Sequence, residues 1–337
     1  MSNENKLTWN NICLSFIAIF CLTITLIHLK SILIPFAVSV FLYFLVSPII
    51  DYLQIKANLP RFISTVITIF FGVLIAGLIL LSFFISIKLF APDAGSYQSK
   101  LQDFGLMVSE FLIANGIEIS KDLVFSNLSN VPIVPFLKGL TGSLVSFFGN
   151  SLLVLVILLF LIEGKDPKRK RHPKIVKATN KVNKYVRDKF FISVGTGVII
   201  WTILSILGID LAGMFGVLTF LLNFIPSVGS LISIVLPLPI VLLEFGFGGV
   251  FLAALIVPAI LQFLIGNILE PKLFGDSLGL HPVAQLFALL FWGAIWGISG
   301  MFLAVPIVVV IKLFLEQYEA TRLLARVLGG QLSDKEV

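Results

Sequence analysis

The sequence predicts an all-α polytopic membrane protein with about eight hydrophobic spans. Two of the C-terminal spans are expected to be re-entrant helical hairpins in an inverted arrangement. Three observations support this fold class. Hydrophobic residues make up 58% of the 337 residues and charged residues 12%, whereas soluble domains carry roughly 25% charged residues. Uncharged runs long enough to cross a hydrocarbon core recur along the chain. Two of these runs are interrupted by glycine and proline.

Eight runs between successive charged residues reach the roughly 20 residues that a membrane-spanning helix needs. As helices, they satisfy their backbone N–H and C=O groups internally, as the bilayer core requires. The runs are Leu7–Leu29, Ser31–Ile50, Phe62–Ile87, Gly139–Ile162, Phe190–Ile209, Leu211–Leu243, Phe245–Leu269 and Ser277–Ile311.

Sequence motifs of soluble enzymes do not occur in the chain. It contains no Cys-x-x-Cys or His-Glu-x-x-His spacing, no phosphate-binding glycine loop and no nucleophile elbow. The sequence therefore predicts a protein that is not an enzyme, with no catalytic residues, no metal site and no cofactor.

Positive charge is concentrated between Lys165 and Lys189, where 11 of the chain's 24 basic residues occur with two acidic ones. The positive-inside rule predicts that this loop is cytoplasmic. Apolar residues recur at helical spacing between the lysines, which indicates an amphipathic helix on anionic lipid headgroups. Aromatic residues for base stacking are few, so we do not expect nucleic acid as a partner. This orientation also places both termini in the cytoplasm.

The charges and the runs divide the chain into six parts. In the outer segment, Leu101, Phe104 and Val108 follow helical spacing, which predicts an amphipathic helix. The parts are three transmembrane helices in residues 1–90, the external helical segment 91–138, a transmembrane helix in 139–163, the basic cytoplasmic loop 164–189, a transport core of broken helices in 190–315 and the cytoplasmic tail 316–337.

The two longest uncharged runs, of 33 and 35 residues, are each interrupted. The first is broken at Asn223–Ser230 ("NFIPSVGS") and the second at Gly293–Gly300 ("GAIWGISG"). The helical pieces before the breaks would be only about 15–18 Å long, too short to span the bilayer. We therefore expect two hairpins that enter from opposite faces, a pattern typical of secondary transporters. The alternative is a set of plain kinked helices whose glycines only permit close packing. It would place the 270–281 loop outside.

The residues around the breaks are the candidate binding residues for substrate or ion. Pro226 is expected in the first turn of a helix, where it would aim free N–H groups at a polar solute. Gln262, Gly266 and Glu270 step by four and form a polar strip, and Asn267 is close enough to meet Glu270. Glu270 is the expected proton carrier. The alternative is a role in packing alone. The candidates are Asn223, Pro226, Gly229, Ser230, Gln262, Asn267, Glu270, Gly297 and Gly300.

The segment "GNILEPKLFGDSLGLHP" (Gly266–Pro282) is predicted to be a cytoplasmic hinge and the mouth of the pathway. Pro271 is expected to end one helix, and His281 and Pro282 are expected to begin the second hairpin. Pairing of Glu270 with Lys272 would oppose the role of Glu270 as proton carrier. Asp210 and Glu244 are expected to bracket the first hairpin on its outer side. The hinge or gate residues are Pro271, Lys272, Gly275, Asp276, Gly279, His281 and Pro282.

Three segments resemble the signature blocks of the autoinducer-2 exporter family, which are bacterial permease-like membrane proteins. They are "LNFIPSVGSLIS" (222–233), "NILEPKLFGDSLGLHP" (267–282) and "GISGMFLAVP" (297–306). The order of spans and loops resembles the family over nearly the whole chain. Ser227 departs from the pattern, since many relatives have an aromatic residue there.

The resemblance implies an inner-membrane secondary transporter that exports a small polar solute, autoinducer-2 or a similar signalling molecule. It also implies a homo-oligomer, a pentamer, with elevator-like movement. A proton or cation gradient is the expected driving force. Other members are associated with sodium or lithium exchange for protons, which would need an alternately exposed acid, and Glu270 is the candidate. The second alternative is a non-transporting membrane scaffold.

Overall fold

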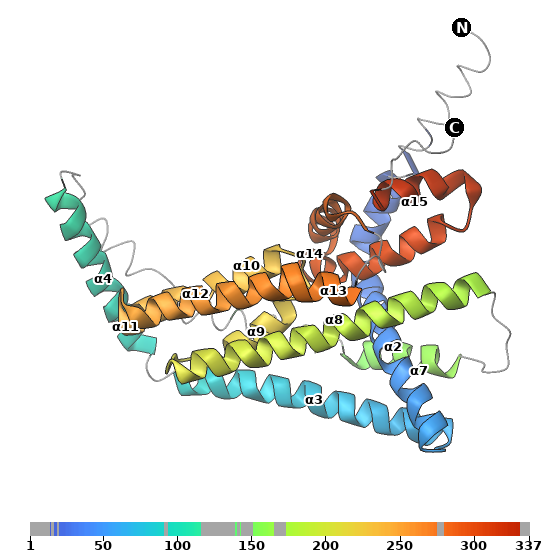
Figure 1. The fold of residues 1–337 in the computed structure, drawn as a ribbon, viewed down its shortest axis with the longest axis horizontal. Helices are drawn as coiled ribbons and strands as arrows, with labels where there is room; N and C mark the ends of the chain where they lie inside the picture. The colour runs from blue at the N-terminus through green and yellow to red at the C-terminus, as the bar shows by residue number, and fades with distance from the viewer. Residues whose placement is uncertain are drawn as a thin grey trace, which may run out of the picture. The chain divides into compact units, whose positions relative to one another are not determined.

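The computed structural model describes residues 14, 17–18, 20–90, 94–115, 139, 142, 151–164, 173–274 and 280–330. All regular secondary structure in these residues is helical (Figure 1). Two compact units are distinguished. Unit 1 comprises Met1–Pro48, Asn150–Val186 and Asp276–Val337, and unit 2 comprises Ile49–Gly149 and Arg187–Gly275.

Six helices among the described residues are long and apolar enough to cross a membrane, which confirms the all-α polytopic membrane fold. The six spans are Lys30–Lys56 (α2), Arg61–Lys88 in α3 (Arg61–Phe90), Thr179–Ile206 in α8 (Pro173–Ile206), Val228–Phe245, Gly249–Leu273 and Pro282–Leu315 (α14). Two shorter apolar helices, Ser151–Glu163 (α7) and Ala212–Leu222 (α9), accompany them. The predicted run Leu7–Leu29 is helical over its described part from Phe20 to His28.

The outer surface of α3 shows why these helices need an apolar solvent. Phe62 is 78% exposed and Phe70 63% exposed, and only 11% of the most apolar 18-residue window of the helix is buried. A helix that is apolar around its whole circumference, with so little of it covered by protein, is stable in contact with lipid.

Unit 2 is built on α3, the second part of α8, and the chain from α9 onward. That chain continues through α10 (Val228–Val235), α11 (Leu238–Phe245), α12 (Gly249–Leu264), the π-helix η2 (Ile265–Leu269) and α13 (Glu270–Phe274). α9 packs against both α3 and α10, and α11 packs against α12. Fully buried apolar side chains fill the core between them, including Phe83, Leu204, Met214 and Val241.

The amphipathic helix predicted for the outer segment is present as α4 (Ala94–Ala114). It packs on α11, and the ring of Phe104 lies 6.1 Å from the ring of Phe247. The apolar face of α4 therefore contacts the protein's own helices. The remainder of the predicted segment, residues 116–138, lies outside the described residues.

The basic segment is also helical where it is described. α8 is a single helix from Pro173 to Ile206, so the predicted amphipathic helix and the following span are continuous. Val182, Tyr185 and Val186 on this helix are at most 5% exposed. Its apolar face is thus covered by protein rather than by headgroups, and lipid contact stays a prediction for the lysines alone.

Unit 1 contains the first part of α2, α7, α14 and the short helix α15 (Arg322–Leu328). The Ser39 hydroxyl donates to the Val154 carbonyl at 2.9 Å, which ties α2 to α7. The ring of Phe41 lies 5.5 Å from the ring of Phe302 on α14. α15 packs on α14, so this part of the predicted C-terminal tail is folded against the protein.

Candidate functional site

Both predicted breaks are present as reversals of the chain. In unit 2, α9 ends at Leu222 and α10 begins at Val228 after a turn in which Ser227 has a φ of 57°. In unit 1, α14 is interrupted at Gly297, with a φ of 63°. Figure 1 draws the two arms of α14 as coils that run in different directions. We call the two turns the first tip and the second tip.

A glycine closes each tip. A methyl group added to Gly229 would overlap the carbonyl oxygen of Leu222, and one added to Gly300 would overlap that of Trp292. Each carbonyl belongs to the arm that precedes the tip, so the absence of a side chain lets the second arm contact the backbone of the first. The two tips therefore share one construction: a residue with positive φ, followed within three positions by a glycine in backbone contact.

Asn223 lies in the first tip and is 2% exposed. Its side-chain Nδ2 donates to the Ser193 hydroxyl of α8 at 3.1 Å. This bond attaches the tip to α8, and a buried amide needs such a partner because desolvation without one is costly. Ser193 is fully buried and was not among the residues predicted from the sequence.

A second buried polar pair joins α10 of the hairpin to α12. Gln262 of α12 donates from Nε2 to the Ser233 hydroxyl of α10 at 2.8 Å, and Ser233 donates to the Ser230 carbonyl. Two buried side-chain atoms of α9 and α12 make no hydrogen bond within the described residues: Oγ1 of Thr219 and Oε1 of Gln262. A buried polar atom without a partner costs about 1–3 kcal/mol. These atoms are therefore the positions where a polar solute or water would add a bond.

The expected role of Pro226 is only partly compatible with the structure. Pro226 precedes α10 instead of lying in its first turn. The N–H of Val228 donates to the Pro226 carbonyl and that of Gly229 to the Ile225 carbonyl. Those two N–H groups are used inside the turn itself, so the prediction that Pro226 aims them at a solute is wrong.

Pro271 does not end its helix, contrary to the sequence-based expectation. The chain continues from α12 through η2 into α13, which reaches Phe274. A proline lacks an N–H group, and its ring clashes with the carbonyl four residues earlier. The π-helix directly before Pro271, where the N–H of Glu270 donates to the Ile265 carbonyl, widens the helix and accommodates the ring.

The predicted polar strip on this helix is divided among different partners. Asn267 is exposed and donates to the Phe263 carbonyl, while the Glu270 carboxylate accepts from Lys189 Nζ at 2.5 Å. Asn267 and Glu270 therefore do not pair as expected. The partner of Glu270 is Lys189, whereas Lys272 is exposed. Gly266, in the middle of the strip, is exposed as well.

The ion pair between Lys189 and Glu270 joins α8 to the start of α13. The Lys189 side chain is 5% exposed, whereas the Glu270 side chain is 23% exposed. The ammonium group thus depends on its partner, and the carboxylate keeps some contact with solvent. Lys189 is the last of the 11 basic residues between Lys165 and Lys189. No local pattern in the sequence distinguishes it from the ten that precede it.

Asp210 and Glu244 bracket the first hairpin, and their location on the outer side of the membrane stays a prediction. The backbone N–H of Asp210 donates to the two carboxylate oxygens of Glu244 at 3.2 and 3.3 Å. This contact joins the chain just before α9 to the C-terminal part of α11. The open end of the hairpin is therefore closed by a charge-assisted hydrogen bond.

At the second tip, Gly297 is exposed and Gly300 is buried. The Trp296 indole donates to the Leu26 carbonyl at 3.0 Å. α14 begins at Pro282 with His281 as its N-cap, which confirms the predicted start of the second hairpin. The predicted hinge residues Gly275, Asp276 and Gly279 lie outside the described residues. The two tips belong to different units.

The six apolar helices and the broken helices define a multi-pass membrane protein, and the comparison with known families gives its class as transport. The family model described as "AI-2E family transporter" matches residues 14–320. The chain belongs to the AI-2E transporter family, which confirms the resemblance inferred from its sequence.

Curated relatives agree with this assignment. The chain is 28% identical over 305 residues to the "AI-2 transport protein TqsA" of Escherichia coli K12, covering 85% of this chain and 86% of that protein. It is 29% identical over 333 residues to a "putative transport protein" of Borreliella burgdorferi, covering 92% and 90%. It is 33% identical over 238 residues to the "putative transport protein YhhT" of Escherichia coli K12, covering 66% of each chain.

Proposed function

We propose that this protein is a secondary transporter of the bacterial inner membrane, with both termini in the cytoplasm, that exports a small polar solute. Autoinducer-2 or a similar signalling molecule is the first choice of substrate, and a proton or cation gradient drives export. The observation that carries the proposal is the set of buried polar side chains at the first hairpin, where Gln262 and Thr219 each keep an oxygen atom without a partner among the described residues. Similarity to a protein named for autoinducer-2 transport supports the choice of substrate.

These buried side chains have the chemistry that an uncharged polar solute needs. Amide and hydroxyl groups at Asn223, Ser233 and Gln262 are held by hydrogen bonds to neighbouring helices. They offer directed bonds without the large desolvation cost of a buried charge. A pathway for a neutral solute is the function best matched to such a set.

A sodium or lithium/proton antiporter is the second candidate, favoured by the ion pair at Glu270. In unit 2 the described acidic side chains between Phe190 and Phe274 are Asp210, Glu244 and Glu270. Glu270 has a buried ammonium as its partner, and proton uptake by Glu270 would release Lys189. Such a carboxylate can couple proton movement to a change in helix position. In an antiporter of this kind, Glu270 would alternate between Lys189 and the transported ion.

Flux measurements on the full-length protein in liposomes test both candidates. We expect outward movement of autoinducer-2 driven by an imposed proton gradient in wild type. We expect at least a tenfold loss in Asn223→Ala, which removes the bond to Ser193, and in Pro226→Ala, which frees the φ angle that proline fixes in the turn. Pro239→Ala is the matched control, because Pro239 is exposed at the start of α11, away from the first tip. Sodium-dependent proton flux with no solute flux would favour the antiporter. Absence of both fluxes would refute transport, leaving the scaffold.

Glu270→Gln is measured in the same assay. We expect solute flux to become insensitive to the proton gradient, because the glutamine side chain cannot take up or release a proton. Glu319→Gln, an exposed glutamate in unit 1, is the control and should leave the gradient dependence unchanged. Flux of Glu270→Gln that follows the proton gradient as wild type does would contradict a coupling role for Glu270.

From the family resemblance, we also propose that the protein is a homo-oligomer, a pentamer, with elevator-like movement. Exposed apolar side chains along α3 give one surface that a second copy or lipid can cover. The oligomeric state is measured by mass photometry of the protein in lipid nanodiscs, where a pentamer is expected. A monomer that retains flux would contradict it.

A further inference from the structure

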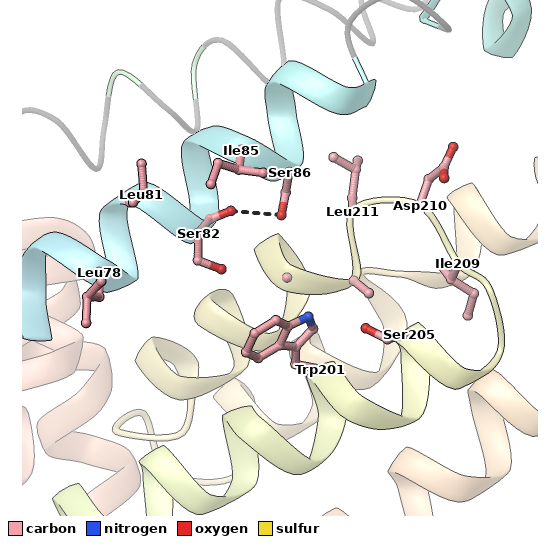
Figure 2. Close-up of a pocket in the computed structure, with 12 residues that line it drawn as sticks. Leu78, Leu81, Ser82, Ile85, Ser86, Trp201, Ser205, Ile209, Asp210 and Leu211 are labelled. Atoms are coloured by element: carbon pink, nitrogen blue, oxygen red, sulfur yellow. Dashed lines mark hydrogen bonds between the residues drawn. The ribbon is translucent and has the colours of Figure 1, made fainter.

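Unit 2 contains a pocket that is distinct from the first tip. It has a volume of about 490 Å³ and lies between α3, α8 and the start of α9 (Figure 2). Small-molecule sites have volumes of about 300–1,000 Å³ and apolar walls with a few polar groups. Leucines and isoleucines of α3 and of the chain before α9 form the apolar wall. The polar lining residues are Ser82, Ser86, Trp201, Ser205 and Asp210.

Three polar atoms of this pocket converge on Gly213. A methyl group at Gly213 would lie 2.6 Å from Ser86 Oγ, 3.3 Å from Ser82 Oγ and 3.6 Å from Trp201 Nε1. The missing side chain therefore lets two hydroxyls and an indole N–H lie directly against the backbone of Gly213, where α9 packs on α3. Figure 2 shows the indole nitrogen on the side of the ring that faces α3 and α9, with Ser205 beside it.

The polar side chains of the pocket include both hydrogen-bond donors and hydrogen-bond acceptors. The Ser86 hydroxyl donates to the Ser82 carbonyl at 2.9 Å, which leaves its oxygen lone pairs as acceptors. Ser82 and Ser205 each add a hydroxyl that donates or accepts, and the Trp201 indole only donates. A ligand that both donates and accepts through several hydroxyl groups matches this set.

The electrostatics of the pocket select against a charged ligand. α9 begins at Ala212, which lines the pocket, and no described side chain caps its first turn, so the positive end of the helix dipole lies at the pocket wall. This disfavours a cation. Asp210, in the lining directly before α9, contributes a carboxylate that disfavours an anion. A neutral solute satisfies both conditions.

We propose that this pocket binds a small, neutral, polyhydroxylated solute. Trp201 and the serines of α3 contact its hydroxyl groups, and the leucines and isoleucines contact its carbon skeleton. The inference rests on the proposed function, because the solute bound here is the one that the protein transports. In the orientation predicted by the loop charges, the pocket lies at the outer end of the pathway. Export then uses two sites in sequence, the first hairpin and this pocket.

Equilibrium binding to the full-length protein in lipid nanodiscs tests the pocket without any flux. The probe is D-ribose, a neutral five-carbon polyol, followed by calorimetry and by tryptophan fluorescence. We expect saturable binding by wild type and at least a tenfold weaker affinity in Gly213→Ala, whose methyl group would overlap the Ser86 hydroxyl and displace it. Gly72→Ala on α3 is the matched control and should bind as wild type does, since no described atom lies near its added methyl group.

Two further variants test which side chains of the pocket contact the solute. Ser82→Ala together with Ser86→Ala should weaken binding, and Trp201→Phe should abolish the fluorescence change while keeping the aromatic ring. Absence of saturable ribose binding, or equal affinity in Gly213→Ala and wild type, would overturn the proposal. So would competition by sodium chloride alone, which indicates a cation site, or by added phospholipid, which indicates a lipid site.

The same variants in the liposome flux assay distinguish the pocket from the transport function. If wild type transports autoinducer-2 and Gly213→Ala transports it equally well, the proposed role of the pocket is refuted and the transport function is supported. Ribose binding that depends on Gly213, in a protein without any flux, retains the pocket as a binding site and refutes transport. Reduced flux together with weakened ribose binding in Gly213→Ala supports both.

Discussion

Glu270→Gln is expected to lower the free energy of unfolding by about 3–5 kcal/mol, the usual cost of leaving one member of a buried ion pair without its partner. The Lys189 side chain is 5% exposed, so its ammonium cannot reach water without a local rearrangement. Lys189→Met should cost clearly less, because the carboxylate it leaves unpaired is 23% exposed and retains contact with solvent. Thermal unfolding in detergent, followed by tryptophan fluorescence, measures both variants.

The double variant Lys189→Met/Glu270→Gln provides the decisive comparison. It removes both charges, and we expect its stability to lie close to that of wild type, since apolar or neutral replacements of buried pairs are often tolerated. If this folded double variant has also lost gradient dependence, Glu270 acts in coupling as well as in stability. Equal losses of stability for Glu270→Gln and Lys189→Met would contradict the difference in exposure that the structure shows.

The second large effect is expected at the glycines that close the two tips. Gly229→Ala and Gly300→Ala should each destabilise the protein by more than about 4 kcal/mol, a loss seen only where a specific contact is broken. In each case the new methyl group would overlap a backbone carbonyl, that of Leu222 or that of Trp292. A backbone atom cannot rotate away as a side chain can, so the two arms must separate.

Gly195→Ala is the control for these substitutions. Gly195 lies inside α8 with no described atom near the position of an added methyl group. Alanine there should be neutral or stabilise the helix by up to about 1 kcal/mol. Retained stability in Gly229→Ala and Gly300→Ala would show that the arms are not in contact at these points, and the construction common to both tips would be wrong.

Local signals explain why the tips were predictable from sequence. A proline and glycines within an otherwise apolar run mark positions where a helix cannot continue, and both breaks occur inside the predicted segments 223–230 and 293–300. The outer helix α4 follows in the same way from the spacing of its apolar residues. Features that depend on residues close together in the sequence could therefore be predicted.

Partners that are distant in sequence were not predictable. Lys189 and Glu270 are separated by 81 positions, and Ser193 and Asn223 by 30. Nothing in the local pattern distinguishes Lys272, two residues from Glu270, from Lys189 on another helix. The error at Pro271 has a different origin, because the rule that proline ends a helix assumes α-helical hydrogen bonding, and the π-helix before it removes the clash.

In the proposed mechanism, the first tip lies in a transport pathway that opens alternately to the two sides of the membrane. Ser227 lies in this tip and is exposed. The most direct measurement is the labelling of Ser227→Cys by a membrane-impermeant maleimide, in a background where Cys13 and Cys21 are replaced by serine. We predict labelling from either side of the membrane, slowed by added autoinducer-2. Labelling from one side only, at a rate that the solute does not change, would contradict this mechanism.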